Sequence, residues 1–254
     1  MYMNTRRMIM VCVLIAAFAG VMYVTLHYKS SAPAIVSPPA PSMPASSCHG
    51  SIEFSSYTFL PGAGAGDVTA RFFSTKQQQK DGALPDNWLT CIELSHGTSS
   101  SPFQVLSGFD FVWTDTSNPL GFITTPDANF DGYRDIQIQS FLGISNARYS
   151  FWLYNPASKT FVYNAALGHL LNPAFNASAR TIDSYASDGC AGACYHDETL
   201  RWEQGNLVVI RKEVQEENND GTAFIKTVLE EMHGVLATSS VQTIPANQIY
   251  GGQQ

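Results

Sequence analysis

Apolar and polar side chains alternate with a period of two along much of the chain after residue 50, and this alternation limits the fold more than any other feature. Clear runs occur at 67–74 (DVTARFFS), 147–154 (ARYSFWLY) and 207–213 (LVVIRKE). Successive side chains of a β-strand point to opposite faces, so each run can bury one face and expose the other. These runs predict strands, whereas a short helix is expected only at 165–171.

Turn-forming residues separate neighbouring runs and predict antiparallel hairpins. We expect hairpins around 155–159 (NPASK), 203–206 (EQGN) and the acidic segment 216–221. Residues 223–233 also fit a helix, but the Asn-Asp-Gly turn before them and the β-rich FIKTV favour a strand. Many short strands at regular spacing predict an all-β, single domain, with a sandwich-like, barrel or propeller-like arrangement.

The N-terminal region has the features of an export signal. Arg6 and Arg7 precede an uncharged apolar run, residues 8–26, that is long enough to cross a bilayer core as a helix. Two interpretations stay open for residues 1–29: an uncleaved signal anchor in the inner membrane, and a signal peptide cut near Ala17-Phe18-Ala19. Both place the rest of the chain in the periplasm, either tethered to the membrane or soluble after cleavage.

A Pro/Ala/Ser-rich segment, residues 30–47, follows the apolar run and predicts a semi-rigid tether. The β-rich exported domain is expected at 48–254. After residue 30 the chain has 11 basic and 21 acidic residues, a net charge of −10. This charge repels phosphate backbones, which argues against a nucleic-acid partner and favours a basic protein partner.

Four cysteines, Cys48, Cys91, Cys190 and Cys194, lie in the exported domain. An even number in an oxidising compartment predicts disulfides, and four cysteines allow three pairings. The simplest pairing closes a small loop with Cys190–Cys194 and staples the start of the domain with Cys48–Cys91. A zinc site of Cys190, Cys194 and His196 is the alternative, but it has no clear fourth ligand.

Residues 127–135 (DANFDGYRD) match the pattern D-x-N-x-D-G-x-x-D, which is typical of calcium loops. Asp127, Asn129 and Asp131 can converge on one cation, and Gly132 permits the sharp turn between them. The remaining oxygens are expected from the Tyr133 carbonyl and from Asp135, directly or through water. The flanks look like strands, and position twelve is Ile138 instead of Glu, so a structural Ca²⁺ between two strands is predicted rather than an EF-hand. The alternative is an acidic turn without an ion.

Other motifs give little support for catalysis. The sequence has no Gly-x-Ser-x-Gly elbow, no paired carboxylates that suit hydrolysis and no ligand spacing among its six histidines. The glycine-rich 62–66 lacks the Lys-Ser/Thr of a phosphate loop. Four acidic residues are interpreted as a solvated hairpin tip: Glu213, Glu216, Glu217 and Asp220. We therefore predict that the protein is not an enzyme, with a hydrolase of unrecognised catalytic residues as a remote alternative.

The order of motifs between residues 127 and 212 carries a family resemblance. The motifs are DANFDGYRDIQI, YSFWLYNPASKTF, LLNPAF, TIDSYASDGCAGACY and LRWEQGNLVVIRKE. In this order they resemble exported β-rich bacterial proteins that include periplasmic immunity proteins. Those proteins inhibit lysozyme-like effectors of bacteria-killing type IV secretion systems and are related in shape to inhibitors of invertebrate-type lysozymes.

The resemblance implies a calcium-containing protein that binds and blocks a lysozyme-like glycoside hydrolase. In such inhibitors a rigid Ser-Gly-x-x-Tyr-like loop plugs the peptidoglycan cleft and contacts the catalytic acids. The matching positions are Ser187, Gly189 and Tyr195, although Asp188 and the Cys190/Cys194 pair are interposed. The alternative function is a calcium-stabilised envelope binding or scaffold module without inhibitory activity.

Overall fold

The computed structural model describes residue 48 and residues 51–76, 87–109, 113–114 and 121–250. The chain divides into two compact units, residues 1–39 and 40–254, and every described residue belongs to the second unit. The predicted export signal and tether lie outside the described residues.

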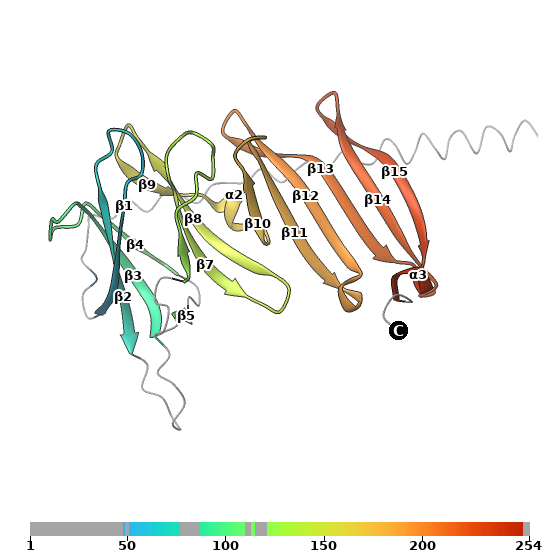
Figure 1. Ribbon diagram of the computed structural model, residues 1–254, viewed down its shortest axis with the longest axis horizontal. Helices are drawn as coiled ribbons and strands as arrows, with labels where there is room; N and C mark the ends of the chain where they lie inside the picture. Colours follow the sequence, from blue (N-terminus) through green and yellow to red (C-terminus); the bar gives the residue numbers. More distant parts are fainter. Residues whose placement is uncertain (1–47, 49–50, 77–86, 110–112, 115–120, 251–254) are drawn as a thin grey trace, which may run out of the picture. The chain divides into compact units, whose positions relative to one another are not determined.

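The described residues form three antiparallel sheets of strands that mostly follow one another in the chain (Figure 1). The first sheet contains β1 (Ile52–Phe59), β2 (Val68–Lys76), β3 (Asn87–His96) and β4 (Gln104–Ser107), with β5 (Trp113–Thr114) also paired to β3. The second contains β6 (Ile123–Thr124), β7 (Ile136–Leu142), β8 (Ala147–Asn155) and β9 (Thr160–Tyr163). The third contains β10 (Pro173–Asn176), β11 (Thr181–Gly189), β12 (Cys194–Glu203), β13 (Asn206–Glu217), β14 (Ala223–Met232) and β15 (Val235–Pro245).

The prediction of an all-β protein built from antiparallel hairpins is confirmed, and none of the three described sheets closes into a barrel. A propeller-like or sandwich-like arrangement stays a prediction. The three expected hairpins are β8–β9, β12–β13 and β13–β14. In the second of these, Gln204 and Gly205 form a two-residue turn with φ of +49° and +83°, the conformation that matches the twist of paired strands.

Helices are short in the described part of the chain. The expected helix at 165–171 is α2 (Ala165–Gly168), which ends earlier because Leu171 forms a bridge with Arg148 of β8. Asn164 caps α2 by accepting a hydrogen bond from the Leu167 N–H group at 3.0 Å. A 3-10 turn, η1 (Cys190–Gly192), joins β11 to β12, and α3 (Ala246–Tyr250) follows β15. The helical alternative for 223–233 is wrong, because these residues form β14.

Three apolar clusters hold the sheets. The first joins side chains of the first and second sheets, with Phe72, Ile92 and Ile136 fully buried. The second joins the second and third sheets around Phe151 and Ile182. Fully burying each such side chain contributes about 1.5–3 kcal/mol. The third cluster is small and contains Ala193, Cys194 and Phe224, with residues of α3 packed against it.

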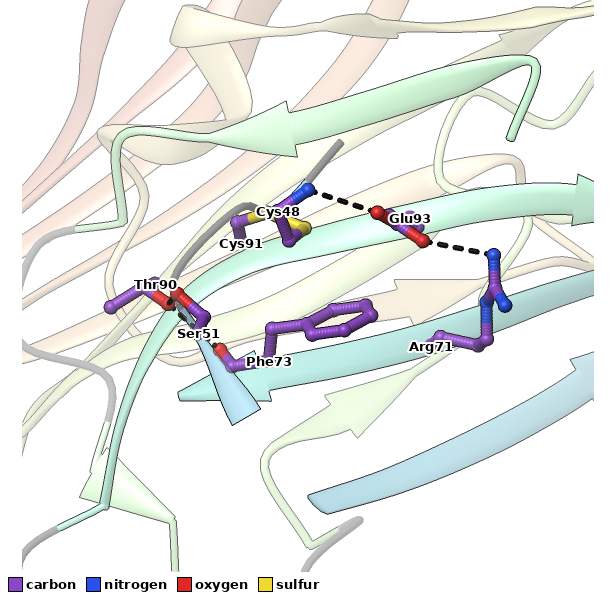
Figure 2. Close-up of a disulfide and its surroundings, with 7 residues drawn as sticks. All are labelled: Cys48, Ser51, Arg71, Phe73, Thr90, Cys91 and Glu93. Carbon is purple, nitrogen blue, oxygen red and sulfur yellow. Dashed lines mark hydrogen bonds and ion pairs between the residues drawn. A yellow bond between two sulfur atoms is a disulfide. The ribbon is translucent and has the colours of Figure 1, made fainter. Parts of the chain in front are cut away.

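The first sheet is also stapled covalently. Cys48 forms a disulfide with Cys91 of β3, as Figure 2 shows. Beside it, the buried carboxylate of Glu93 accepts hydrogen bonds from the Cys48 backbone N–H and from the Arg71 guanidinium, each at 2.9 Å. The start of the described domain is therefore fastened to β3, inside the first sheet, by a covalent bond and by a hydrogen bond to the buried Glu93 carboxylate.

Candidate functional site

The predicted calcium loop, residues 127–135, connects β6 to β7, as its strand-like flanks indicated. We call it the oxygen-rich loop. β6 and β7 pair with Ile123 opposite Ile138, so the two ends of the loop are held at a fixed separation. The loop is thus a connection within the second sheet.

Three predicted ligands of the oxygen-rich loop lie close together. The Asp127 carboxylate accepts hydrogen bonds from the backbone N–H groups of Asp131 (3.0 Å) and Gly132 (2.9 Å). The Asp131 carboxylate accepts from the Tyr133 N–H (2.9 Å) and from the Asn129 amide (2.8 Å). Gly132 has φ of +90°, a conformation that favours glycine. The side chains of Asp127, Asn129 and Asp131 therefore hydrogen-bond within one turn, and their convergence on a cation stays a prediction.

Asp135 is placed differently from the other predicted ligands, because its side chain is fully buried. One carboxylate oxygen accepts a hydrogen bond from the Ala128 N–H and the other from the Tyr154 N–H of β8, each at 2.8 Å. Burial raises the pKa of Asp135 to about 7, against the two backbone hydrogen bonds, and the nearby charges of Asp131 and Asp127 add to the increase. Asp135 therefore fastens the loop to the second sheet.

The oxygen-rich loop also contacts the two other sheets. The Arg134 N–H donates to the carbonyl of Pro61, in the connection between β1 and β2, at 2.6 Å. The Trp202 indole of β12 donates to the Ala128 carbonyl at 2.9 Å. A Cβ added at Gly62 would come within 2.5 Å of the Tyr133 ring, which shows how closely the first sheet approaches. The loop is thus a junction of all three sheets.

The donors of the oxygen-rich loop suit a hard cation only in part. Among the described residues, no three His, Cys, Asp or Glu side chains stand close enough to form a metal-binding group. Calcium, however, also accepts amide, backbone carbonyl and water oxygens. A carboxylate oxygen that accepts one N–H retains a second lone pair. Asp127, Asn129 and Asp131 therefore fit as side-chain ligands of a cation. The Tyr133 carbonyl is a further predicted ligand, and Asp135 lies buried beneath the loop.

The predicted partner-binding residues lie at the β11–β12 hairpin. Residues 187–195 are called the disulfide loop here, because Cys190 and Cys194 are joined with a Cα–Cα distance of 5.2 Å. Both predicted disulfides are therefore confirmed. The zinc alternative is not supported, since two of its three ligands are bonded to each other and His196 instead contacts Asp188, with 2.7 Å between Nδ1 and Oδ2.

The tip of the disulfide loop has an unusual backbone. Gly189, Cys190, Ala191 and Gly192 all have positive φ, from +50° to +104°. This conformation costs a non-glycine residue roughly 1–2 kcal/mol, so the disulfide and the paired strands must hold it in place. At the base of the loop, Asn146 accepts from the Ser187 N–H (2.9 Å) and donates to its carbonyl (3.0 Å). Asn146 thus fixes the Ser187 end of the loop, and the disulfide closes its tip.

The structure brings the predicted residues together but aims Tyr195 away from the tip. Ser187 and Tyr195 are cross-strand partners, and Asp188 and Gly189 are exposed. The Tyr195 hydroxyl donates to Glu213 of β13 at 2.6 Å, and its ring stacks on Tyr185 with centroids 5.7 Å apart. Tyr195 therefore lies on the face of the third sheet, beside the tip.

Glu213 is the centre of a polar cluster on that face. It accepts hydrogen bonds from Tyr195, Lys226 and Arg211, each at 2.6 Å. Burial alone would raise the pKa of Glu213, but these three partners outweigh it and lower the pKa to about 2. The interpretation of Glu213 as part of a solvated hairpin tip is wrong, because the side chain is nearly buried within β13. The sequence signal for this placement was that Glu213 stands two residues from both Arg211 and Gln215, the spacing of side chains on one face of a strand.

No helix in the described part of the chain is long and apolar enough to span a membrane. The apolar run at residues 8–26 lies outside that part.

Comparisons with known proteins add one likeness. No protein-family model and no curated protein matches the sequence. A solved structure described as a Xanthomonas type IV secretion system related protein is similar to 75% of this chain and 98% of its own, with 17% sequence identity and a TM-score of 0.49. A likeness of this extent does not identify a function.

Proposed function

We propose that the protein is an exported inhibitor, or immunity protein, that binds and blocks a lysozyme-like peptidoglycan hydrolase. The observation that carries this proposal is the disulfide loop. Its tip is exposed, its backbone is held in a left-handed turn by Cys190–Cys194, and its base is clamped by Asn146. A loop that is already ordered loses little conformational entropy on binding, which is what an inserting inhibitor requires.

The negative charge of the exported domain favours a protein partner with a basic surface. The exported domain carries a net charge of −10, and Asp188 stands exposed at the loop tip. A basic hydrolase would be attracted over a long range, and the encounter would weaken as salt screens the charges. We therefore expect association to slow as ionic strength rises.

The test is inhibition of lysozyme-like hydrolases by the full-length protein and two variants. Asp188→Arg reverses the charge at the exposed tip and should raise the inhibition constant by roughly 100-fold. Asp67→Arg makes the same change at an exposed position in the β1–β2 connection and should leave inhibition nearly unchanged. Equal inhibition by both variants would show that the disulfide loop does not contact the hydrolase. A wild-type protein that inhibits none of the enzymes but captures an envelope component would favour the scaffold alternative.

Calcium is proposed as a structural cofactor of the oxygen-rich loop. Its support is geometric: the loop gathers Asp127, Asn129 and Asp131 at the junction of the three sheets. An ion there would stabilise the whole domain rather than one hairpin, since it binds only the folded state.

A thermal melt with calcium or with a chelator tests this proposal. At a calcium concentration about 100 times the dissociation constant, the melting temperature should rise by roughly 5–10 °C. Asp131→Ala should abolish the increase, whereas Asp67→Ala should preserve it. A melting temperature that the chelator leaves unchanged in the wild type and in every variant would contradict the proposal.

The proposed location is the periplasm. Residues 8–26 would tether the protein to the inner membrane if they stay uncleaved, and their removal would leave it soluble. The mass of the mature protein separates the two outcomes.

A further inference from the structure

The β7–β8 hairpin ends in three large apolar side chains that the fold does not use. Phe141 and Leu142 are 53% and 72% exposed, and Ile144 is completely exposed. We call these three side chains the apolar tip. None of them belongs to an apolar cluster of the described part of the chain, and no charged residue occurs between Asp135 and Arg148. Contiguous exposed apolar side chains of this kind mark interaction sites.

The turn itself does not require apolar side chains. The Gly143 N–H donates to the Asn146 carbonyl at 2.8 Å, which closes a four-residue turn with Ile144 at its second position. Such turns favour Gly, Pro, Asn, Asp and Ser, because these residues set the backbone conformation or hydrogen-bond to it. The Ile144 side chain does neither, so it is available for a contact with another molecule.

The apolar tip is nevertheless well supported by its surroundings. The Asn172 side chain donates to the Ser145 carbonyl at 3.1 Å and accepts from the Ala147 N–H at 2.8 Å. The Phe141 ring lies over Gly143, where an added Cβ would come within 3.1 Å of it. Apolar side chains on an ordered turn lose less conformational entropy on binding than the same side chains on a mobile one.

The apolar tip adjoins the disulfide loop. Asn146, two residues after Ile144, is hydrogen-bonded to both the N–H (2.9 Å) and the carbonyl (3.0 Å) of Ser187. The reach of the chain then places Ile144 within about 20 Å of Asp188. A protein interface of standard size covers about 800 Å² of each partner, a patch roughly 30 Å across. A protein seated on Asp188 can therefore bury the apolar tip in the same interface.

Charge favours a protein over a phospholipid surface as the partner of the apolar tip. Asp188 stands exposed on the adjoining loop, and the exported domain carries a net charge of −10. An anionic phospholipid surface would repel both. A basic hydrolase would be attracted by the same charges, and the apolar tip would add the buried contact that slows its release.

We propose that the apolar tip is a second binding element for the hydrolase, which inserts into an apolar recess beside the cleft that the disulfide loop occupies. The inference rests on the proposed function, because the partner is the same enzyme. The two elements have different kinetic roles. The charge of Asp188 acts mainly on the association rate, whereas burial of Leu142 and Ile144 acts mainly on the dissociation rate.

Inhibition by the full-length protein in mild detergent tests this division of roles. The double variant L142S/I144S should raise the inhibition constant by roughly 30-fold through faster dissociation, with the association rate and its salt dependence unchanged. Its melting temperature should equal that of the wild type, because both side chains are exposed. Val235→Ser is the matched control: it removes an exposed valine at the end of β15 opposite to α3, whose residues pack against Cys194. This variant should inhibit like the wild type.

Failure of this inference and failure of the proposed function give different results. Equal inhibition by the wild type and L142S/I144S would overturn the inference alone, whereas a wild type that inhibits no hydrolase would overturn both. The fluorescence of Ile144→Trp, measured against the wild type in vesicles of phosphatidylethanolamine and phosphatidylglycerol, gives a second readout. Its emission should shift to shorter wavelength only after the hydrolase is added. A shift before that addition would place the tip in the lipid and overturn the inference.

Discussion

Asp135 is a buried carboxylate whose two oxygens both accept backbone hydrogen bonds. Asp135→Asn would keep the shape but replace one acceptor with a donor, leaving the N–H of Ala128 or Tyr154 facing an N–H group. We expect a loss of about 2 kcal/mol of unfolding free energy, measured by urea unfolding in the presence of a chelator so that bound calcium does not contribute. Asp67→Asn, at an exposed position, should be neutral. An equally stable Asp135→Asn would show that the two hydrogen bonds contribute little.

Glu213 should make the unfolding free energy of the protein depend on pH in the acid range. Its pKa is lowered from 4.5 to about 2 in the folded protein. The stabilisation is therefore fully present above about pH 5 and is lost as the pH falls toward 2. Unfolding of the wild type and Glu213→Gln across this range should show a difference in free energy that shrinks with acidification. A difference independent of pH would mean that the ion pairs with Lys226 and Arg211 do not stabilise the fold.

Contacts between residues that are neighbours in the sequence could be predicted. Contacts that strand pairing brings about could not. The spacing of Asp127, Asn129 and Asp131 was enough to predict that their side chains share one tight turn, because the residues that hydrogen-bond there are only two to five positions apart. The hydrogen bond from Tyr195 to Glu213 depends on the register of β12 on β13, which no local pattern states. The burial of Asp135 likewise follows from its contact with β8.

At the scale of elements, the two disulfides allow a direct comparison. Cys190–Cys194 closes a loop of sequence separation 4, and Cys48–Cys91 one of 43. In the chain-entropy account their removal should cost about 2 and about 4 kcal/mol, respectively. Denaturant unfolding of C190S/C194S and C48S/C91S measures both. Only C190S/C194S should also weaken inhibition, by roughly 10-fold, since it frees the left-handed tip. Unchanged inhibition would show that the strands alone hold the loop.

The hairpins were the most predictable elements, because turn chemistry and period-two alternation are both local signals. The two-residue turn at Gln204–Gly205 lies within the expected 203–206, whereas the turn of the third hairpin starts after Glu217, because Glu216 and Glu217 continue β13. The end of the short helix was less predictable: α2 stops before Leu171, whose bridge to Arg148 is a long-range contact.

At the scale of the whole molecule, the all-β class followed from the sequence but the division into three sheets did not. Most strands that start or end a sheet, β4, β6, β9 and β10, are short, and a run of so few residues has little alternation from which a sheet edge could be predicted. The division instead depends on which apolar faces meet, as in the clusters around Phe72 and Phe151. The oxygen-rich loop was predicted as a link between two strands, and its position against all three sheets emerged only from contacts with Pro61 and Trp202.

The Cys48–Cys91 disulfide has a mechanical consequence. Tension arriving through residues 30–47 would enter the domain at Cys48 and, without the disulfide, would pull on β1, an edge strand that can peel from β2 one residue pair at a time. The disulfide instead passes the force to Cys91 of β3, which pairs with Phe73 of β2 on one side and Ser107 of β4 on the other. A strand held on both sides must break its bonds together. A force applied at Cys48 would therefore load the middle of the first sheet before it reached β1.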